Sequence, residues 1–354
     1  MHKLSRRDLA QGLARYLAVG GLASGFGALG GLVNLAQAQG QPLDKVVLAG
    51  WSKPISEITN LLVEADKGFF RAQGIEFSYL PGAGGGDALR NLLSGQADVA
   101  FTDPGSLFAA LDKGEKLRAI YDVYPQNVFN VVSLKSRGIT KPADLKGKRV
   151  GVYSLSSGTR QNLQVLLHSA GLTEADITLV PTGLLNFAPL MQGQVDATAA
   201  TDTGLLVGRQ RGLGEVNVME VRQQLNLSSD LLVVREDSYQ QKKALLRRFL
   251  SGFRDSAQWM MRAPEEAARL ATRVAIDGQN EAINLEVIKL RNASSVSALT
   301  PSRYEAPLPR LCLPRASADC SEVCGTVIGG TEGERRPYIY YNSCTGSVLL
   351  ILYL

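Results

Sequence analysis

Short apolar runs alternate with amphipathic segments from residue 45 onward. Residues 45–50 and 99–102 are dominated by apolar side chains over the length of a strand, which is typical of buried strands. Residues 55–65 instead place apolar side chains at the spacing of one helical face, so we expect a helix there. Such alternation favours α/β lobes with largely parallel sheets. The same reasoning predicts strands at 75–79 and 117–121 and helices at 87–93 and 104–113.

A second series of strands and helices begins with the stretch 139–159. Its centre is a turn of serine and glycine residues between a β-branched strand and an amphipathic helix, and Ser156, Ser157 and Thr159 are good N-cap residues for that helix. A helix N-terminus carries free N–H groups and the positive end of the dipole, so this turn suits an anion or a polar ligand edge; a capped turn without ligand is the alternative. The predicted elements are a short helix ending at Gly147, a strand at 149–153, a helix at 159–170, a strand at 177–180, a helix ending near Met191 and a strand through Ala199.

Two segments at corresponding places in the two series resemble each other. Residues 93–100 and 191–198 both follow a loop and a helix, and both contain a Gly-Gln-x-Asp turn that leads into a strand. An aspartate follows each strand, Asp103 in the first series and Asp202 in the second. This similarity predicts two lobes of one architecture.

Two further stretches, 122–132 and 228–235, have the extended, β-rich pattern of connections between lobes. Because the chain crosses twice, we expect the first lobe to be discontinuous in sequence. The predicted limits are residues 39–124 and 232–303 for lobe 1 and residues 125–231 for lobe 2. Helices predicted at 237–262, 264–275 and 281–291 complete lobe 1.

Residues 1–38 have the features of an export signal that is cleaved after Ala38. A basic start is followed by a glycine-rich apolar run and by the small-residue site Ala36-Gln37-Ala38. The sequence Ser-Arg-Arg-Asp-Leu at 5–9 resembles a twin-arginine motif. An uncleaved membrane anchor is the alternative. We therefore expect an exported, soluble protein in the periplasm.

The pattern changes after Arg303, where prolines cluster and all four cysteines follow between Cys312 and Cys344. In an exported protein these cysteines allow two disulfides in any of three pairings, whereas a zinc site around Cys320 and Cys324 has little support because no histidine is near. We favour a third interpretation, in which residues 304–354 are a frameshifted or disordered tail outside the functional fold.

Charge excludes one class of function. The chain has a formal net charge of +5, of which +3 belongs to the first 38 residues, and no basic run remains in the +2 of the mature chain. A nucleic-acid-binding protein needs a clustered basic face, so we expect no nucleic-acid partner.

Four segments carry a resemblance to a known family: 64–75, 93–98, 144–152 and 193–197. Their sequences are Glu-Ala-Asp-Lys-Gly-Phe-Phe with a later Gly-Ile, Leu-Ser-Gly-Gln-Ala-Asp, Asp-Leu-Lys-Gly-Lys-Arg-Val-Gly-Val and Gly-Gln-Val-Asp-Ala. In this order and spacing, residues 45–300 resemble the periplasmic substrate-binding proteins of ABC transporters, in the nitrate/sulfonate/taurine and thiamine-pyrimidine-precursor (NMT1-like) group. The resemblance implies a type II architecture of two α/β lobes, joined by two hinge strands, that closes on a ligand. It also implies an ABC permease and ATPase at the inner membrane as partners. The tail departs from this pattern, since the family ends in ordinary helices.

The lobed architecture predicts where a ligand lies, because open α/β sheets bind ligands beyond the carboxyl ends of their strands. Trp51 offers a flat apolar wall and an N–H donor, and the glycine loop 82–86 lets backbone N–H groups approach an oxyanion. The alternatives are a core tryptophan, a flexible surface turn, and simple helix N-caps for Asp103 and Asp202. The predicted ligand-binding residues are Trp51, Ser52, Gly84, Gly85, Thr102 and Asp103 from lobe 1 and Ser154, Ser156, Ser157, Thr159, Asn186, Thr201 and Asp202 from lobe 2.

We expect a monomeric solute-binding protein with no catalytic residues, cofactor or metal, which captures a small polar or anionic solute and delivers it to an ABC importer. An enzyme is the first alternative, since eukaryotic pyrimidine-precursor synthases share the implied fold. Their chemistry needs a lysine-bound pyridoxal cofactor and a histidine, but the mature chain has only His168, on a helix away from the predicted cleft. A ligand sensor that docks on a membrane receptor is the second alternative.

The nature of the solute stays open between two chemistries. A sulfonate or nitrate needs N–H donors and hydroxyls, which both predicted cleft loops offer. A pyrimidine needs aromatic stacking and a carboxylate, for which Trp51, Asp103 and Asp202 are candidates. The sequence slightly favours a small anion or a neutral polar metabolite.

Overall fold

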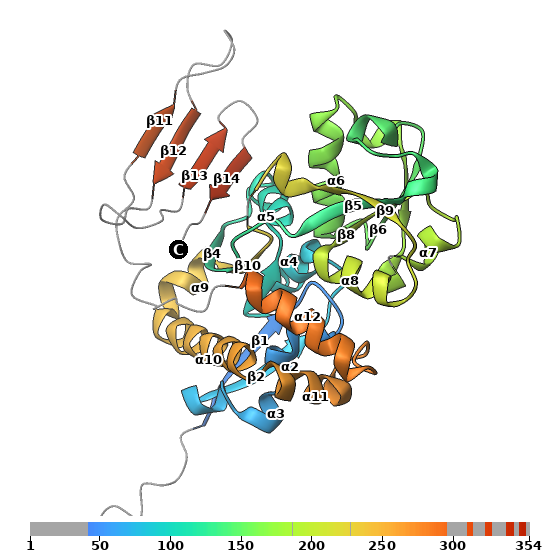
Figure 1. Cartoon of the computed structure of the whole chain (residues 1–354). Helices are drawn as coiled ribbons and strands as arrows, with labels where there is room; N and C mark the ends of the chain where they lie inside the picture. The colour runs from blue at the N-terminus through green and yellow to red at the C-terminus, as the bar shows by residue number, and fades with distance from the viewer. Residues whose placement is uncertain are drawn as a thin grey trace, which may run out of the picture. The chain divides into compact units, whose positions relative to one another are not determined.

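The structure is a computed structural model that describes residues 42–185, 187–226 and 228–295, and four short strands between 310 and 351. Up to residue 295 the strands form two five-stranded sheets, and Figure 1 shows each sheet with its own helices. The predicted α/β class with two lobes is confirmed. The export signal predicted at 1–38 lies outside the described residues.

The first sheet has the strand order β2-β1-β3-β10-β4. β1 pairs in parallel with β2 and β3, whereas β10 runs antiparallel to both β3 and β4. The sheet is therefore mixed, and the expectation of largely parallel sheets is wrong here because β10 enters the sheet in the opposite direction. The strands are β1 (Asp44–Ala49), β2 (Ile75–Leu80), β3 (Val99–Thr102), β4 (Leu117–Tyr124) and β10 (Asp230–Arg235).

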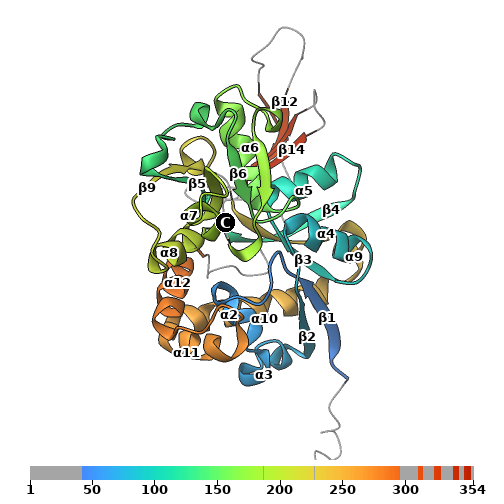
Figure 2. The ribbon, with the colours of Figure 1, turned by 90° about the vertical axis from the view of Figure 1, so that its right-hand side faces the viewer.

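Helices cover both faces of this sheet because side chains alternate in direction along each strand. In β10, Leu232 and Val234 pack in a cluster with α10, whereas Leu231 and Val233 pack in a cluster with α4 and α5. Figure 2 shows α10 beside β1 and β2, away from α4 and α5. The helices of this lobe are α4 (Gly85–Leu93), α5 (Pro104–Leu111), α9 (Glu236–Gln241), α10 (Lys243–Arg262), α11 (Pro264–Val274) and α12 (Glu281–Ser294).

Three aromatic rings anchor α10 to the first sheet. The ring of Phe70 stacks on Phe77 of β2 with 3.9 Å between centroids and on Phe249 of α10 with 5.5 Å between centroids. Phe70 and Phe249 are fully buried, and the buried residues of α10 recur at helical spacing. Aromatic burial of this kind is a large part of a core's stabilisation, so α10 belongs firmly to the first lobe.

The single helix expected at 55–65 is divided into three short pieces. These are the 3₁₀ helix η1 (Ser56–Ile58), α2 (Thr59–Leu62) and α3 (Glu64–Lys67). The Thr59 hydroxyl donates to the Ser56 carbonyl at 2.7 Å, and the Asn60 amide donates to Ser256 of α10 at 3.0 Å. One local and one distant hydrogen bond thus help to hold this segment in a shape that its own apolar spacing does not indicate. The break leaves Glu57 facing the space between the lobes.

The second sheet has the order β7-β6-β8-β5-β9 and is mixed in the same way. β6 is parallel to β7 and β8, whereas β5 is antiparallel to β8 and β9. α8 and β9 lie between residues 199 and 228, where we predicted no strand and considered a helix only through the capping alternative for Asp202. The elements are β5 (Phe129–Leu134), β6 (Arg149–Val152), β7 (Thr178–Pro181), β8 (Ala197–Thr201), β9 (Val216–Glu220), α6 (Gly158–Ser169), α7 (Ala188–Met191) and α8 (Asp202–Gln210).

The chain passes between the two sheets twice, from β4 to β5 and back into β10. Polar side chains join the two connecting segments to each other. The Asn127 amide donates to the Leu225 carbonyl at 3.0 Å, and the Ser229 hydroxyl donates to the Gln126 carbonyl at 2.6 Å. Both crossings are therefore fixed side by side. The residue limits given above for the two lobes stay a prediction.

Beyond residue 303 the structure describes only four strands, which pair consecutively in an antiparallel sheet. They are β11 (Arg310–Leu313), β12 (Val323–Val327), β13 (Tyr338–Asn342) and β14 (Ser347–Ile351). That this tail lies outside the functional fold stays a prediction. Among the described residues, no helix combines the length and apolar character needed to cross a bilayer.

Candidate functional site

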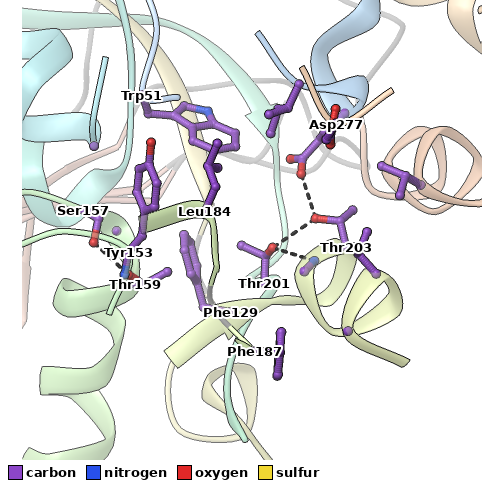
Figure 3. A pocket seen from close by; sticks show the side chains of 18 of the residues that line it. Trp51, Phe129, Tyr153, Ser157, Thr159, Leu184, Phe187, Thr201, Thr203 and Asp277 are labelled. Carbon is purple, nitrogen blue, oxygen red and sulfur yellow. Dashed lines mark hydrogen bonds between the residues drawn. The ribbon is translucent and has the colours of Figure 1, made fainter. Parts of the chain in front are cut away.

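A cavity of about 320 Å³ lies where loops of both lobes meet. Its wall is mostly apolar and aromatic, and Figure 3 shows the side chains of Trp51, Phe129, Tyr153 and Leu184 converging on one space. Trp51 follows β1, Phe129 begins β5 and Tyr153 follows β6, so these residues come from strand ends of both sheets. Trp51 also packs edge-on against Phe101 of β3, at 6.1 Å between ring centroids. The result is a flat-walled site suited to a planar organic group.

Seven of the predicted ligand-binding residues line this cavity. Ser52, Thr102, Ser154, Ser156 and Asp202 do not appear in its lining, and Asn186 lies outside the described residues. Direct contact of any of these residues with a ligand stays a prediction. The seven lining residues are Trp51, Gly84, Gly85, Asp103, Ser157, Thr159 and Thr201.

The glycine loop and the serine turn, each expected to hold ligand, contact each other. Gly86 donates its backbone N–H to the Ser156 carbonyl at 3.0 Å, and the Ser156 hydroxyl donates to the Ala83 carbonyl at 3.3 Å. The Ser154 hydroxyl also donates to the Ala83 carbonyl. These hydrogen bonds join the two lobes at one rim of the cavity, where Ala83 and Gly86 of the glycine loop lie against Ser154 and Ser156 of the serine turn.

Within the serine turn, the hydroxyls bond to their own loop. Ser157 occupies the N-cap position of α6, but its hydroxyl donates to the Ser154 carbonyl at 2.6 Å and makes no capping bond to the helix. The Thr159 hydroxyl accepts the Tyr153 N–H at 3.0 Å and lies 2.7 Å from the Ser157 hydroxyl. The predicted side-chain cap is therefore wrong, because the turn uses these hydroxyls to hold Tyr153 against the cavity.

The two aspartates that follow the matched strands behave differently. Asp103 is the N-cap of α5, where its carboxylate accepts the Ser106 N–H at 2.8 Å and the Ser106 hydroxyl at 2.7 Å. In the second lobe the N-cap of α8 is Thr201, which accepts the Gly204 N–H at 3.2 Å. The capping alternative thus holds for Asp103 and is wrong for Asp202, which is the first helical residue.

Four carboxyl groups line the cavity, against one arginine. The carboxyl groups belong to Glu57, Asp103, Asp230 and Asp277, and the arginine is Arg211, whose side chain is exposed. Burial raises the pKa of Asp103 above its usual range. Burial, followed by the charges of Asp103 and Glu57, raises the pKa of Asp230 well above its usual range. The site is therefore poor in positive charge, and burial favours the neutral form of two of its carboxyl groups.

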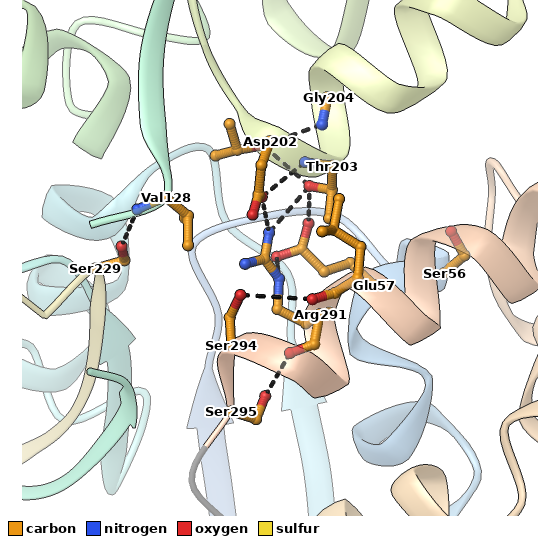
Figure 4. A network of polar contacts seen from close by, with 12 residues as sticks. Ser56, Glu57, Val128, Asp202, Thr203, Gly204, Ser229, Arg291, Ser294 and Ser295 are labelled. Atoms are coloured by element: carbon orange, nitrogen blue, oxygen red, sulfur yellow. Dashed lines mark hydrogen bonds and ion pairs between the residues drawn. The ribbon is translucent and has the colours of Figure 1, made fainter. Parts of the chain in front are cut away.

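Arg291 of α12 lies beneath this wall, fully buried, and joins the two lobes (Figure 4). Its guanidinium pairs with Glu57 of lobe 1 at 2.8 Å and with Asp202 of lobe 2 at 2.8 Å. The Thr203 hydroxyl donates to Glu57 at 2.7 Å and accepts from Arg291 at 3.1 Å. Burial lowers the pKa of Arg291, but Glu57 and Asp202 outweigh this effect and raise it, so the guanidinium stays charged.

The Arg291 guanidinium also lies 4.5 Å from the ring centre of Tyr124, a cation–π distance. We refer to Arg291, Glu57, Asp202 and Thr203 as the arginine cluster. Two of its members, Glu57 and Thr203, line the cavity, so the cluster connects the wall of the site with the contact between lobes.

Sequence reasoning missed several lining residues because it searched only the ends of strands. Asp230 lies at the start of β10, Asp277 follows α11, and Glu57 lies in the 3₁₀ helix η1. Tyr153 was not selected either, although it is the last residue of the strand predicted at 149–153 and lines the cavity. Arg291 gave no signal, because a lone arginine in an amphipathic helix normally faces solvent.

Two α/β lobes with a cavity at their junction define the periplasmic-binding-protein fold. The "NMT1/THI5 like" family model matches residues 55–267, which is more than half of the chain, and the chain belongs to this family.

Relatives of known name are about a quarter identical to this chain over the residues that align. A "Putative thiamine biosynthesis protein" of Haemophilus influenzae is 26% identical over 58% of this chain and 66% of its own length. The "Riboflavin-binding protein RibY" of Chloroflexus aurantiacus is 24% identical over 69% of this chain and 70% of its own. A "4-amino-5-hydroxymethyl-2-methylpyrimidine phosphate synthase" of Schizosaccharomyces pombe is 28% identical, over only 37% of each chain. The chain thus spans about two thirds of the first relative.

Solved structures agree on the fold. The alkanesulfonate-binding protein SsuA of Xanthomonas axonopodis pv. citri, bound to MOPS, has a TM-score of 0.61 and 18% identity, covering 74% of this chain and 89% of that protein. The aliphatic sulphonate-binding protein SsuA of Escherichia coli has a TM-score of 0.55 and 19% identity, covering 72% and 84%. Likeness at this identity establishes the architecture alone.

Proposed function

We propose that this protein is an extracytoplasmic solute-binding protein, which captures a small solute between its lobes and delivers it to an ABC permease and ATPase. The observation that carries the proposal is the cavity of about 320 Å³, to which both lobes contribute side chains. Such a volume is at the lower end of the range for small-molecule sites, roughly 300–1,000 Å³. Location in the periplasm, a monomeric state and export of the chain belong to the same proposal.

The lining favours a flat organic ring over a small inorganic anion. Trp51, Phe129, Tyr153 and Phe187 supply aromatic surface, whereas the exposed Arg211 is the only basic side chain in the lining as far as the described residues show. A sulfonate or nitrate binds best where hydrogen-bond donors are joined by positive charge, and the described lining offers that charge only in the exposed Arg211. The sequence slightly favoured a small anion or a neutral polar metabolite; of the open chemistries, this lining favours the pyrimidine-type ring, in line with the names of the relatives.

Binding without catalysis is favoured over the synthase alternative. In the described part of the chain, the cavity lining contains no lysine, histidine or cysteine. A pyridoxal cofactor is held by a lysine, and His168 is exposed on α6 rather than in the cavity. The name of the fission-yeast relative keeps the synthase as the second candidate. A sensor that docks on a membrane receptor would use the same cavity and would differ only in its partner.

A thermal-shift screen of the exported chain tests the proposal. The panel contains 4-amino-5-hydroxymethyl-2-methylpyrimidine, riboflavin, thiamine, taurine, an alkanesulfonate and nitrate. A specific ligand at 100 times its dissociation constant stabilises the fold by about 2.7 kcal/mol. We expect a ring compound to raise the melting temperature and Trp51→Ala to abolish that rise. A folded protein that ignores every ring compound contradicts the preference for a ring, and one that turns over a compound in the panel contradicts binding without catalysis.

A further inference from the structure

We propose that Asp230 selects the charge of the solute. Its carboxylate receives an N–H group of an uncharged or cationic nitrogen compound, and it keeps anions out of the cavity. The inference rests on the solute-binding function proposed above and states the chemistry by which the same cavity discriminates among ligands.

Asp230 differs from the other carboxyl groups of the lining in its partners. Asp103 accepts two hydrogen bonds from Ser106, and Asp277 accepts two from Ser56, at 2.7 and 3.1 Å. Glu57 belongs to the arginine cluster. Among the described residues, no hydrogen-bond donor contacts the Asp230 side chain. Three of the four carboxyl groups are therefore committed to structural bonds, and Asp230 alone keeps its acceptor capacity for a ligand.

The position of Asp230 in the sheet directs this group toward the site. It begins β10, whose following residues Leu231–Val234 are fully buried in the core of lobe 1. A register shift separates Asp230, which pairs with Tyr124, from Leu231, which pairs with Asp122. Such irregularities bend a strand and redirect a side chain, often next to a binding site. Asp230 is only 6% exposed and lines the cavity.

An almost fully buried carboxylate that accepts no hydrogen bond from the described residues is energetically costly, because it has lost most of its water and only the attraction of Arg291 offsets this loss. A ligand that brings an N–H group to Asp230 removes this cost. A ligand that brings a second negative charge increases the cost. Asp230 therefore increases the affinity for ligands with amino, amidine or ring N–H groups and decreases the affinity for sulfonates and carboxylates.

The charges that face Asp230 reinforce this selection. They come from Glu57 in η1, Asp103 after β3, Asp122 in β4 and Arg291 in α12, and the guanidinium already pairs with Glu57 and Asp202. Burial raises the pKa of Asp230, and Asp103 and Glu57 raise it further. Because the raised pKa favours the neutral acid, binding of a ligand that needs the carboxylate form is coupled to loss of the Asp230 proton, and its affinity increases as pH rises.

Three probes measured by isothermal titration test the inference on the full-length exported protein. 4-Amino-5-hydroxymethyl-2-methylpyrimidine carries an exocyclic amino donor, its 4-oxo counterpart replaces that group by an acceptor oxygen, and benzenesulfonate is a ring of similar size with a negative charge. The variants are Asp230→Asn and Asp230→Ala. The control is Glu76→Gln, which removes one negative charge from β2 outside the cavity lining, where the side chain is 59% exposed.

We expect the wild type and Glu76→Gln to bind the amino compound about 10-fold or more tightly than the 4-oxo compound, the effect of one hydrogen bond to a charged group. Asp230→Ala reduces this ratio to near 1 while binding of the 4-oxo compound persists, which also shows that the variant is folded. For Asp230→Asn we expect an affinity ratio between that of the wild type and that of Asp230→Ala. Proton release on binding, detected in two buffers of different ionisation enthalpy, disappears in both variants.

Three results overturn the inference. A ratio that Asp230→Ala leaves unchanged shows that another group recognises the nitrogen, although solute binding stands. Tighter binding of benzenesulfonate than of the amino compound by the wild type likewise leaves a solute-binding protein but refutes the selection against anions. Binding of none of the three probes counts against the proposed ring ligand itself, and with it against the role of Asp230.

Discussion

At the scale of single residues, the protein buries a carboxyl group that forms no ion pair among the described residues, which is rare because burial of an unpaired charge is costly. Asp122 of β4 is fully buried, and one carboxylate oxygen accepts the Ser228 hydroxyl at 2.8 Å while the other has no partner among the described residues. Burial raises the pKa of Asp122 to about 7, against the lowering effect of the Ser228 hydrogen bond. The residue is thus protonated in the folded protein at a pH where the unfolded chain is ionised.

Asp122→Asn tests this consequence through the pH dependence of stability. Between pH 4 and 7 the folded wild type holds a proton that the unfolded chain releases, so its free energy of unfolding falls as pH rises and levels off above about 7. The full effect of such a shift is roughly 4 kcal/mol. In Asp122→Asn, the free energy of unfolding should not show this decrease with pH. Urea unfolding at pH 4.5, 6.0 and 7.5 measures the free energy of unfolding of both proteins.

Asp144→Asn is the control for that series. Asp144 lies at the surface and is partly exposed, and hydrogen bonds from the Thr140 and Lys141 backbone lower its pKa, which is the opposite direction. Its contribution is present above its unfolded pKa and is lost only in more acidic solution. Asp144→Asn should therefore leave the slope between pH 5 and 7.5 unchanged. Equal slopes in wild type and Asp122→Asn would show that Asp122 ionises normally.

At the scale of elements, α12 carries the one fully buried arginine that the structure describes. The helix packs on α11 and η1 in lobe 1 and on α8 in lobe 2. The positive charge of Arg291 neutralises the carboxylates of Glu57 and Asp202. A buried pair of this kind adds little net stability over an apolar alternative, yet removing one partner leaves an unpaired buried charge. The arginine cluster therefore specifies how α12 docks more than it strengthens the fold.

We expect Arg291→Met to lower the free energy of unfolding by about 3–5 kcal/mol, since the buried Glu57 and the partly exposed Asp202 lose their cation. Lys289→Met on the same helix removes an ion pair with Glu265 whose side chains are 54% and 65% exposed, and it should cost less than about 1 kcal/mol. Chemical denaturation of both variants measures the difference. Similar losses in the two variants would mean that the cluster contributes no more than a surface pair.

At the scale of the whole binding unit, the two lobes meet through backbone as well as side-chain contacts. Gly84 has φ of +132° and lies against Ser156 of the other lobe. A Cβ at Gly84 would come within 2.6 Å of the Ser156 carbonyl carbon and 2.9 Å of the Ser157 Cα. Backbone cannot move aside as a flexible side chain can, so only glycine permits this approach of the lobes.

Gly84→Ala should therefore separate the lobes at the rim of the cavity. We expect a larger radius of gyration by small-angle scattering in the presence of ligand and an affinity at least about 10-fold weaker, a loss of 1.4 kcal/mol. Gly95→Ala is the control: Gly95 has φ of +77°, but a Cβ there would meet nothing within 4 Å. This control carries the strain of a positive φ without the clash. An equal loss of affinity in both variants would show that backbone strain at a positive φ, and not the clash with Ser156, weakens ligand binding.

The alternation of strands and helices could be predicted from sequence because it depends on local periodicity. The runs that became β1, β3 and β6 are short, apolar and bounded by turn residues, and each was predicted within about one residue. The direction of β5 and β10 was not predictable in this way. A strand's sequence does not state which neighbour it pairs with, and both strands enter their sheets from the crossings.

The candidate site likewise contains residues that the sequence could predict and residues that it could not. The rule that ligands lie beyond strand ends selected Trp51, Asp103 and Thr201, which the cavity brings together. It could not select Asp230, Asp277 or Glu57, since their place depends on how distant segments fold against one another. The Ser56–Asp277 hydrogen bonds span 221 residues of sequence. No local pattern carries that information.

The sequence by itself determined the class of fold, the order of the elements and the loops that approach each other, because periodic burial and turn chemistry act over a few residues. The tertiary structure alone decided the charge of the cavity and the junction of the lobes. Whether a carboxylate is paired, buried or free depends on neighbours brought from elsewhere in the chain, as Arg291 is brought to Glu57 and Asp202. Electrostatic energies depend on distance and burial in space, and a linear sequence specifies neither.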